Sequence, residues 1–559
     1  MWCYSFTLAR KRGCGHSQGP EQDEIRRRAC ETLIVLLYHG TAVNFATYAD
    51  TVARNDPEGL AMSDHTREVT FAELAGEVNA VANALESLDV EAGDRVALYL
   101  PNSVGFMTAY LGAMKRGAIP FPINMRFQGE EVRYVLGDAE AVAVVTHGQF
   151  EEMVAGLDVP SVEHLIVADG DAGHSYRELV GAADTTYDAY PRKEDELAEL
   201  MYTSGTTGRP KGVKHTHRNL QANARGLVEA MGWSNDTVSL TVCPLFHVSG
   251  LNVTTTPLLT VGAENHFLPQ WDPETALETM AARGVIYAFF IPTMVIDLLE
   301  HGVGGHDLSA LETVGVGGSP MPKERIETVE SEFGVTLLEG YGMTETTPLA
   351  AINRPDQDVR KAGSIGPPAH EVVDVRIEDP ETGAAVGTDE KGELLWHGDT
   401  VTPGYYGMPE KNEESFVERA VPEGQRGGAG GTADGDGKRW LRSGDIARMD
   451  EDGHLFVEDR IDDMIITGGE NVYPREIEDV IYELEGVVEV AVIGTPDERL
   501  GETVTAVVVA EEEMTADDVE SHCRERLTDY KIPRRVEFAE ELPKTSTRKI
   551  DKVSLREEF

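Results

Sequence analysis

Cysteines and long apolar runs are both scarce in this chain of 559 residues. The five cysteines are scattered and none forms a C-x-x-C pair, so a structural zinc site is not expected. An odd, sparse count of this kind is typical of a reducing cytoplasm. The nearest candidate for a membrane span, residues 33–38, is far shorter than the ~18 apolar residues that cross a bilayer. We therefore expect a cytoplasmic protein without a transmembrane segment and with at most peripheral membrane contact.

Basic residues are half as frequent as acidic ones. The sequence holds 49 lysines and arginines against 98 aspartates and glutamates, which gives a formal net charge of −49. Such a charge disfavours binding to nucleic acid or to an anionic membrane surface. The acidic residues are spread along the chain, a distribution typical of the solvated surface of a halophilic protein.

Strand and helix patterns alternate through most of the chain, and 41% of its residues are apolar, enough for substantial cores. Thr70 and Glu73 have the spacing of a capping box before apolar residues at helical intervals. The alternation predicts βαβ units and a mostly parallel sheet. Its expected strands include residues 95–100, 118–122 and 141–146, with a helix over 106–116.

Two later regions have other patterns. From about residue 370, antiparallel strands of a smaller subdomain are expected at 372–378, 391–397 and 440–442, with a Gly- and Asp-rich surface insertion at 424–438. The last hundred residues predict a compact α+β module with helices at 475–485 and 516–527 and strands at 488–494, 502–510 and 535–538.

The fold class we predict is α/β. It has a large N-terminal domain of mixed, mostly parallel sheets plus a small β-subdomain, and a small mobile α+β C-terminal domain. We expect an extension over residues 1–40, which carry a basic cluster but no signal-peptide pattern. The large domain then spans 41–459, a hinge 460–463 and the small domain 464–559.

One stretch, residues 201–212 (MYTSGTTGRPKG), combines hydroxyl side chains, glycines and Lys211. Glycines let backbone N–H groups approach an anion closely, and hydroxyls and a lysine add donors and positive charge, so the stretch suits a polyphosphate. Its spacing differs from the common P-loop. We expect this loop between a strand ending at Tyr202 and a helix over 219–231, where an open α/β sheet binds ligands.

Four further motifs follow in register, and with the first they resemble the adenylate-forming (AMP-binding) superfamily of acyl-CoA synthetases, peptide-synthetase adenylation domains and luciferases. They are YGMTE at 341–345, SGD at 443–445, DRIDD at 459–463 running into GGENVYP at 468–474, and PKTSTRK at 543–549. The resemblance covers residues 45 to 555. It implies that ATP activates a carboxylic acid as an acyl-adenylate with release of pyrophosphate, and that the acyl group then passes to CoA.

The resemblance also assigns nucleotide-binding roles. The residues expected to hold ATP are Thr203, Ser204, Gly205, Thr206, Thr207, Gly208, Lys211, Gly318, Ser319, Glu339, Gly340, Tyr341, Asp445 and Arg460. The 203–211 group matches the family's clamp on the β- and γ-phosphates, Tyr341 could stack on adenine, and Asp445 could accept hydrogen bonds from the ribose hydroxyls. Glu345 is the expected Mg²⁺ ligand, since Mg²⁺ is commonly held by one or two carboxylates plus phosphate oxygens.

Three residues are expected to act in catalysis. Lys549 would bridge the substrate carboxylate and the α-phosphate, stabilising charge that develops in the transition state. Thr344 could donate a hydrogen bond to the α-phosphate, and His247 could gate carboxylate entry, with ordinary packing as the alternative for this histidine. In the family the small domain then rotates, Asp462 matching the pivot, and the Gly468–Gly469 loop replaces Lys549 and lines the CoA channel.

The acid itself is left open between two classes. A fatty acid, and hence a role in lipid metabolism, is the first expectation, and residues 467–474 (TGGENVYP) look most like the fatty-acyl and aryl branches of the family. The glycines at 315, 317 and 318 would leave room for a long or broad acyl chain. An aryl acid such as a benzoate, cinnamate or succinylbenzoate is the alternative. A non-catalytic acyl- or nucleotide-binding protein is a third reading, against which stand the chemical residues Lys211, Glu345, Asp445, Arg460 and Lys549, all present.

Overall fold

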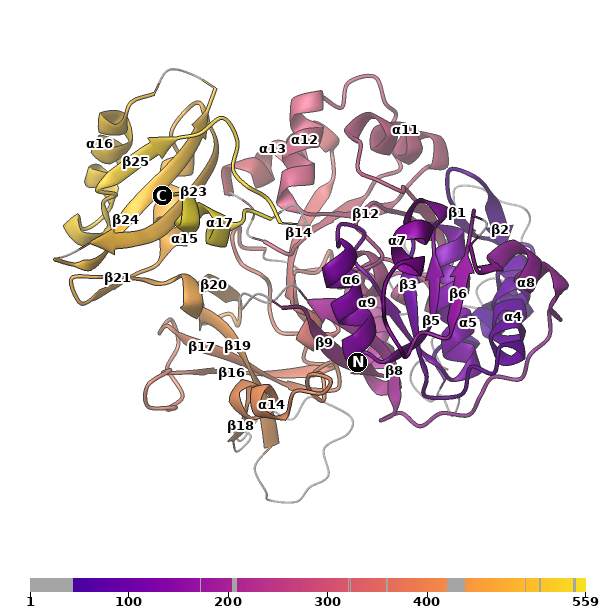
Figure 1. Cartoon of the computed structure of the whole chain (residues 1–559). Helices are drawn as coiled ribbons and strands as arrows, with labels where there is room; N and C mark the ends of the chain where they lie inside the picture. Colours follow the sequence, from indigo (N-terminus) through magenta and orange to yellow (C-terminus); the bar gives the residue numbers. More distant parts are fainter. Residues whose placement is uncertain are drawn as a thin grey trace.

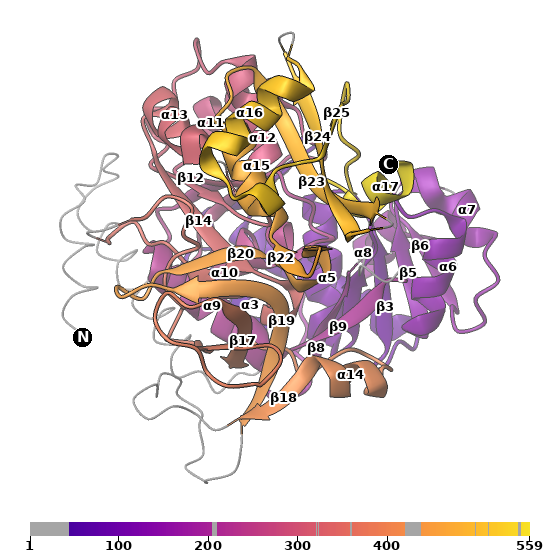
Figure 2. The same ribbon diagram turned by 90° about the vertical axis from the view of Figure 1, so that its left-hand side faces the viewer.

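The computed structural model describes residues 44–559 apart from 171, 204–208, 320, 322, 358–359, 420–437, 498, 512–513 and 546–548, and apart from the side chains of 323 and 324. The expected extension over 1–40 therefore lies outside the described residues. The chain forms a large lobe and a smaller C-terminal lobe, drawn in yellow, which lies against it (Figures 1 and 2).

The core of the large lobe is an eight-stranded sheet. Its inner strands are parallel, and only the outermost two pair antiparallel with their neighbours. Across the sheet the order is β15 (Leu349–Ile352), β14 (Thr336–Gly342), β13 (Thr313–Val316), β12 (Tyr287–Phe290), β10 (Val238–Thr241), β11 (Glu264–Phe267), β1 (Leu60–Ser63) and β2 (Glu68–Thr70). This confirms the predicted βαβ organisation.

A second, five-stranded sheet is wholly parallel. Its order is β4 (Ile119–Pro122), β3 (Arg95–Tyr99), β5 (Ala141–Thr146), β6 (His164–Val167) and β7 (His174–Ser175). The helices of the large lobe are α3 (Thr47–Asn55), α4 (Phe71–Ser87), α5 (Val104–Arg116), α6 (Gly129–Asp138), α7 (Glu151–Ala155), α8 (Tyr176–Ala182), α9 (His217–Met231), α10 (Thr256–Val261), α11 (Pro273–Arg283), α12 (Pro292–His301) and α13 (Lys323–Phe333).

The predicted capping box of Thr70 and Glu73 is confirmed at the start of α4.

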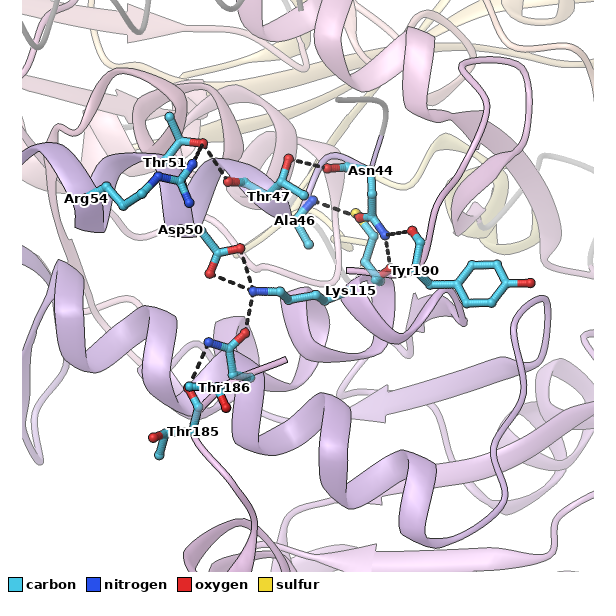
Figure 3. Close-up of polar contacts among 12 residues, drawn as sticks. Asn44, Ala46, Thr47, Asp50, Thr51, Arg54, Lys115, Thr185, Thr186 and Tyr190 are labelled. Atoms are coloured by element: carbon cyan, nitrogen blue, oxygen red, sulfur yellow. Dashed lines mark hydrogen bonds and ion pairs between the residues drawn. The ribbon is translucent and has the colours of Figure 1, made fainter. Parts of the chain in front are cut away.

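Helices α3, α4 and α5 are held together by a buried cation. The Lys115 ammonium group, fully buried on α5, lies 2.6 and 2.5 Å from the two carboxylate oxygens of Asp50 on α3 and also donates to Asn79 on α4 (Figure 3). A buried charge needs such partners, so this cluster fixes how the three helices pack.

The β-subdomain is antiparallel throughout, as predicted. It contains β16 (Val373–Glu378), β17 (Gly392–Gly398), β18 (Phe416–Arg419), β19 (Lys438–Met449) and β20 (Leu455–Arg460), and α14 (Pro409–Ser415) precedes β18. Lys438, which we expected in the surface insertion, begins β19 instead because its backbone pairs with Arg419. Residues 424–437 of that insertion lie outside the described residues.

The small lobe is the predicted α+β module. Strands β22 (Glu470–Val472), β21 (Ile465–Thr467), β24 (Gly501–Ala510) and β23 (Val487–Asp497) form its sheet, and β25 (Arg535–Phe538) pairs parallel with β24. Its helices are α15 (Pro474–Tyr482), α16 (Ala516–Arg526) and α17 (Lys552–Glu558). A 3₁₀ turn, Ile461–Asp463, joins β20 to β21 at the place where we expect the hinge.

The setting of the 201–212 stretch differs from the prediction. It lies between β8 (Leu197–Thr203) and β9 (Lys211–Thr216), which pair as an antiparallel hairpin in a sheet of two strands. The expected strand-to-helix loop is therefore wrong: a second strand intervenes before α9, which Thr216 caps. Within the residues that the structure describes, no helix has both the length and the apolar character that a bilayer crossing requires.

Candidate active site

The hairpin presents Thr203 and Lys211 at the base of the proposed phosphate loop, where they are paired across the two strands. Residues 204–208, the centre of that loop, lie outside the described residues. The Lys211 ammonium nitrogen lies 6.0 Å from the ring centroid of Tyr405. Burial and the nearby Lys411 lower the pKa of Lys211, while the carboxylate of Glu345 acts in the opposite direction. Lys211 and the expected Mg²⁺ ligand, Glu345, therefore both lie near the side chain of Tyr405.

Glu345 is held in a short 3₁₀ turn, Thr344–Thr346, that follows β14. The Tyr405 hydroxyl donates to its carboxylate at 2.8 Å, and the Thr402 N–H donates to its carbonyl at 2.8 Å. Among the described residues, no group of three or more His, Cys, Asp or Glu side chains gathers as a metal cage. One carboxylate completed by phosphate oxygens is a ligand set that suits Mg²⁺, so the donors present fit this ion.

Asp445 is the centre of a second cluster. It is buried on β19, where its carboxylate accepts a hydrogen bond from the Tyr341 hydroxyl and lies 3.5 Å from the guanidinium of Arg460. Burial raises the pKa of Asp445, and the charge of Arg460 opposes that rise. The Tyr341 ring stacks on Trp396, with ring centroids 5.9 Å apart. The structure thus brings together residues of three motifs, with Tyr341 lying 104 positions before Asp445 in the sequence.

The other predicted nucleotide contacts lie on β14 or shortly after the end of β13. Glu339 and Gly340 precede Tyr341 on β14, and the buried Glu339 carboxylate accepts a hydrogen bond from the Gly363 N–H at 3.0 Å. Gly318 and Ser319 follow β13, and Gly318 has a left-handed backbone with φ of 86°. The carboxylate of Glu339 is thus already engaged by the backbone.

Lys549 reaches this place from the small lobe. A Cβ placed on Gly318 would lie 3.5 Å from Lys549 Cε and 3.7 Å from its Nζ, so the side chain passes directly over this glycine. Burial lowers the pKa of Lys549, and Arg460 lowers it further, whereas Asp445 raises it. The Thr545 N–H donates to the Lys549 carbonyl at 2.7 Å.

The charge of Lys549 affects the side chain of His247. Its Nδ1 accepts the Ser249 N–H at 3.2 Å and lies 2.8 Å from the Ser249 hydroxyl. Burial lowers the pKa of His247 to about 3, and the positive charge of Lys549 contributes to that shift. The imidazole is therefore neutral at pH 7, and its Nε2 carries the hydrogen because Nδ1 is the acceptor.

Gly468 and Gly469 are not brought to this place. They form the turn between β21 and β22, with φ of 62° and 92°, and the Gly468 N–H donates to the Leu500 carbonyl at 2.9 Å. A Cβ placed on Gly468 would meet only Leu500 of the small lobe within 4 Å, and one placed on Gly469 would meet nothing. Lys549, and not this turn, therefore lies beside Gly318 in this structure.

Tyr405 and Trp396 are site residues that sequence reasoning missed. The Tyr405 hydroxyl bonds Glu345, 60 positions away in the sequence. The Trp396 ring, on β17 of the β-subdomain, stacks on the ring of Tyr341. Neither belongs to one of the five motifs. Only the aromatic pair Tyr405–Tyr406 beside Gly404 offered a signal, and a turn explains such a pair equally well.

Comparison with known proteins agrees with this geometry. The family model "AMP-binding enzyme" matches residues 49–406, and the model "AMP-binding enzyme C-terminal domain" matches residues 476–549. The chain belongs to the AMP-binding enzymes. Like its relatives in this family, it is an acid–thiol ligase of the AMP-forming type, with ATP and CoA as co-substrates and Mg²⁺ as the metal.

Three similar proteins illustrate the range of this AMP-binding family. A feruloyl-CoA synthase of Amycolatopsis sp is 34% identical over 91% of this chain and 97% of its own length. The long-chain-fatty-acid–CoA ligase FadD13 of Mycobacterium tuberculosis is 32% identical over 88% of this chain and 93% of its own length. The crystal structure of ATP-bound MatB from Rhodopseudomonas palustris superposes with a TM-score of 0.84 at 31% identity, covering 93% of this chain and 99% of that one.

Proposed function

We propose that this AMP-binding enzyme is an aryl-acid–CoA ligase, which activates a compact, ring-bearing carboxylic acid and transfers it to CoA. The observation that carries this choice is the aromatic filling of the space over the glycines at 315–317, next to Lys549. It favours the second of the two acid classes that the sequence left open.

Phe289 and Tyr287 supply this filling from β12. Phe289 is the strand partner of Gly315. A Cβ placed on Gly315 would lie 2.5 Å from the Tyr287 hydroxyl oxygen, and one placed on Gly317 would lie 3.2 Å from Phe289 Cζ. Both rings are buried, and the ring of Trp233 packs edge-on against Tyr287 with centroids 4.9 Å apart. The glycines therefore make room for the protein's own rings.

The order of the glycines on and after β13, relative to Lys549, limits the shape of the acid that fits. Gly318 lies under Lys549, so a carboxylate held by this lysine directs its acyl part toward Gly317 and Gly315. A long flexible chain would have to displace both buried rings there. A planar acid can instead pack against them, and aromatic pairs add about 0.5–1.5 kcal/mol to area burial. Feruloyl-CoA synthase and FadD13 are nearly equal in identity, so the likeness does not separate the two acid classes, and the geometry is what supports the aryl acid.

In the first half-reaction, the chain's own acting residues are Lys549, Lys211 and Thr203. A carboxylate oxygen of the acid attacks the α-phosphorus, and the bond to the bridging oxygen of pyrophosphate breaks. Lys549 stabilises the charge that develops between carboxylate and α-phosphate, and Lys211 with Thr203 holds the departing phosphates. Mg²⁺ held by Glu345 would neutralise phosphate charge. In the second half-reaction the CoA thiolate attacks the acyl carbon and AMP leaves.

A panel of acids tests the proposal. Pyrophosphate and AMP release would be measured with benzoate, cinnamate and ferulate, and with linear acids from hexanoate to palmitate, in the presence of CoA. We expect turnover with the ring-bearing acids and little turnover with linear acids whose chains are longer than an aromatic ring. Palmitate as the best substrate would overturn the aryl assignment.

The variant Phe289→Ala sharpens this test, because it removes a ring from the pocket. It should raise the relative rate with linear acids. Phe290→Ala is the matched control, since Phe290 is buried on the opposite face of the same strand and packs on Trp271. Equal changes in acid preference in both variants would contradict the assignment of Phe289.

A further inference from the structure

A fully buried acid–imidazole pair lies on the hairpin that carries the phosphate loop, outside all five motifs. Glu199 on β8 and His215 on β9 are partners across the two strands, four residues down from Thr203 and Lys211. Both side chains have no exposed surface, and Glu199 Oε1 lies 2.7 Å from His215 Nδ1.

The carboxylate of this pair is held on every side. The Tyr110 hydroxyl donates to its Oε2 at 2.6 Å, and the Asn252 amide donates to its Oε1 at 2.9 Å. Three polar groups from three different elements thus converge on Glu199. A group fixed in this way can orient the imidazole that it bonds, because the imidazole cannot rotate without losing that bond.

The other nitrogen of the imidazole reaches the site. His215 Nε2 lies 2.7 Å from the carbonyl oxygen of Thr344, a contact that spans 129 positions. Since a carbonyl can only accept, Nε2 carries the hydrogen and donates it. The same carbonyl accepts the Thr347 N–H at 3.2 Å, the bond that closes the turn holding Glu345. His215 thus bonds the turn of the expected Mg²⁺ ligand to the hairpin of the phosphate loop.

We infer that Glu199 and His215 are positioning residues for the binding of ATP with Mg²⁺. They set the distance between the two halves of the polyphosphate site, the hairpin with Lys211 and the turn with Glu345. The inference rests on the roles proposed for those two residues. Outer-shell partners of this kind commonly change metal affinity about 10–100-fold when they are removed.

Two substitutions of His215 separate positioning from mere stability. Asparagine places its amide where Nδ1 lies, so His215→Asn keeps the bond to Glu199 and loses the bond to Thr344. Glutamine reaches the position of Nε2, so His215→Gln keeps the donor to Thr344. The control is Thr108→Val on α5, which removes a buried hydroxyl that bonds Tyr176 and Gly105 away from the site.

The dissociation constant of ATP would be measured by calorimetry with Mg²⁺ and with EDTA, at equal folded fractions. For H215N we expect ATP with Mg²⁺ to bind about tenfold more weakly, with a much smaller change in EDTA. For H215Q and T108V we expect values within about threefold of the wild type, below the roughly 10–100-fold range of a lost outer-shell partner. Pyrophosphate release with a good acid should follow the same order, while thioester formation from a supplied acyl-adenylate stays unchanged.

Several outcomes would overturn the inference. One is equal ATP binding in H215N and H215Q, and another is the same loss in EDTA as with Mg²⁺. Should H215N not fold, Glu199→Ala replaces it, because this change removes the side chain that bonds the imidazole and leaves His215 in place. If neither variant folds, the pair belongs to the core alone and the inference is wrong. A wild type that binds ATP with Mg²⁺ but turns over no acid would count against the proposed function and not against this pair.

Discussion

At the scale of single residues, Lys549 makes the sharpest prediction. Its ammonium group lies beside Gly318, whereas a Cβ on Gly469, in the turn expected to line the CoA channel, would meet nothing within 4 Å. Lys549→Ala should lower adenylate formation by about 10² or more, the usual effect of losing a group that stabilises transition-state charge. Thioester formation from a supplied acyl-adenylate should persist, because in the rotation that the family resemblance implies Lys549 leaves the site before that step. Pyrophosphate release and CoA-ester formation measure the two reactions separately.

Lys544→Ala is the matched control for Lys549. Lys544 lies on the same loop but pairs with Glu489 at 3.0 Å, within the small lobe. This variant should leave both half-reactions near wild-type rates. A parallel fall of both half-reactions in the Lys549 variant would show that this lysine does not serve one step alone.

His217 gives a prediction about pH and stability. It is buried at the start of α9, its Nδ1 accepts the Phe45 N–H at 3.2 Å, and burial lowers its pKa to about 3. The unfolded chain takes up a proton near pH 6.5, whereas the folded chain does so only near pH 3. Folding stability from this group is therefore full above pH 6.5 and is lost as pH falls toward 3, by about 1.4 kcal/mol per pH unit.

The variant His217→Asn keeps an acceptor for Phe45 and removes the titration. Its melting temperature should fall less between pH 7 and pH 5 than that of the wild type, as followed by scanning calorimetry. His65→Asn, at an exposed histidine, serves as the control and should keep the wild-type dependence. A fall in His217→Asn as large as in the wild type would contradict the buried, neutral state of this imidazole.

At the scale of elements, the turn between β21 and β22 should control the second half-reaction. A Cβ on Gly469 would meet nothing within 4 Å, so this turn is open in the present arrangement. Gly469→Leu should spare pyrophosphate release and strongly reduce CoA-ester formation, because the side chain would enter the expected CoA channel. Gly453→Leu is the matched control: this glycine also has positive φ, 83°, and open surroundings, but lies in the β19–β20 turn. Normal CoA transfer in Gly469→Leu would remove the channel role.

The elements also show what sequence reasoning can and cannot reach. The capping box at Thr70 and the strands of the small lobe were predictable because their signals are local: a fixed offset or an apolar run. Strand β9 was missed because Lys211–Thr216 mixes charged and apolar residues without a clear period, and only its pairing with β8 reveals it. The bond from His215 to Thr344 was out of reach for the same reason, since tertiary packing alone brings them together.

At the scale of the whole molecule, the excess of acid dominates. With 98 acidic and 49 basic residues, one-to-one pairing leaves half of the acids without a cation. Lys361 shows how one cation is shared, since its Nζ lies 2.5 Å from Asp450 and 2.6 Å from Asp452. The remaining like charges repel, and that repulsion destabilises the compact state.

Salt should therefore stabilise the protein over a defined range. The Debye length falls from about 30 Å at 0.01 M salt to about 3 Å at 1 M, so repulsion between surface carboxylates is largely screened by then. We expect the melting temperature to rise steeply as KCl increases to about 1 M and to change less beyond it. Sucrose at matched osmolality controls for exclusion from the protein surface, which requires no charge and should give no such steep initial rise. A melting temperature that falls or stays level as KCl is raised would mean that the acidic surface does not limit folding stability.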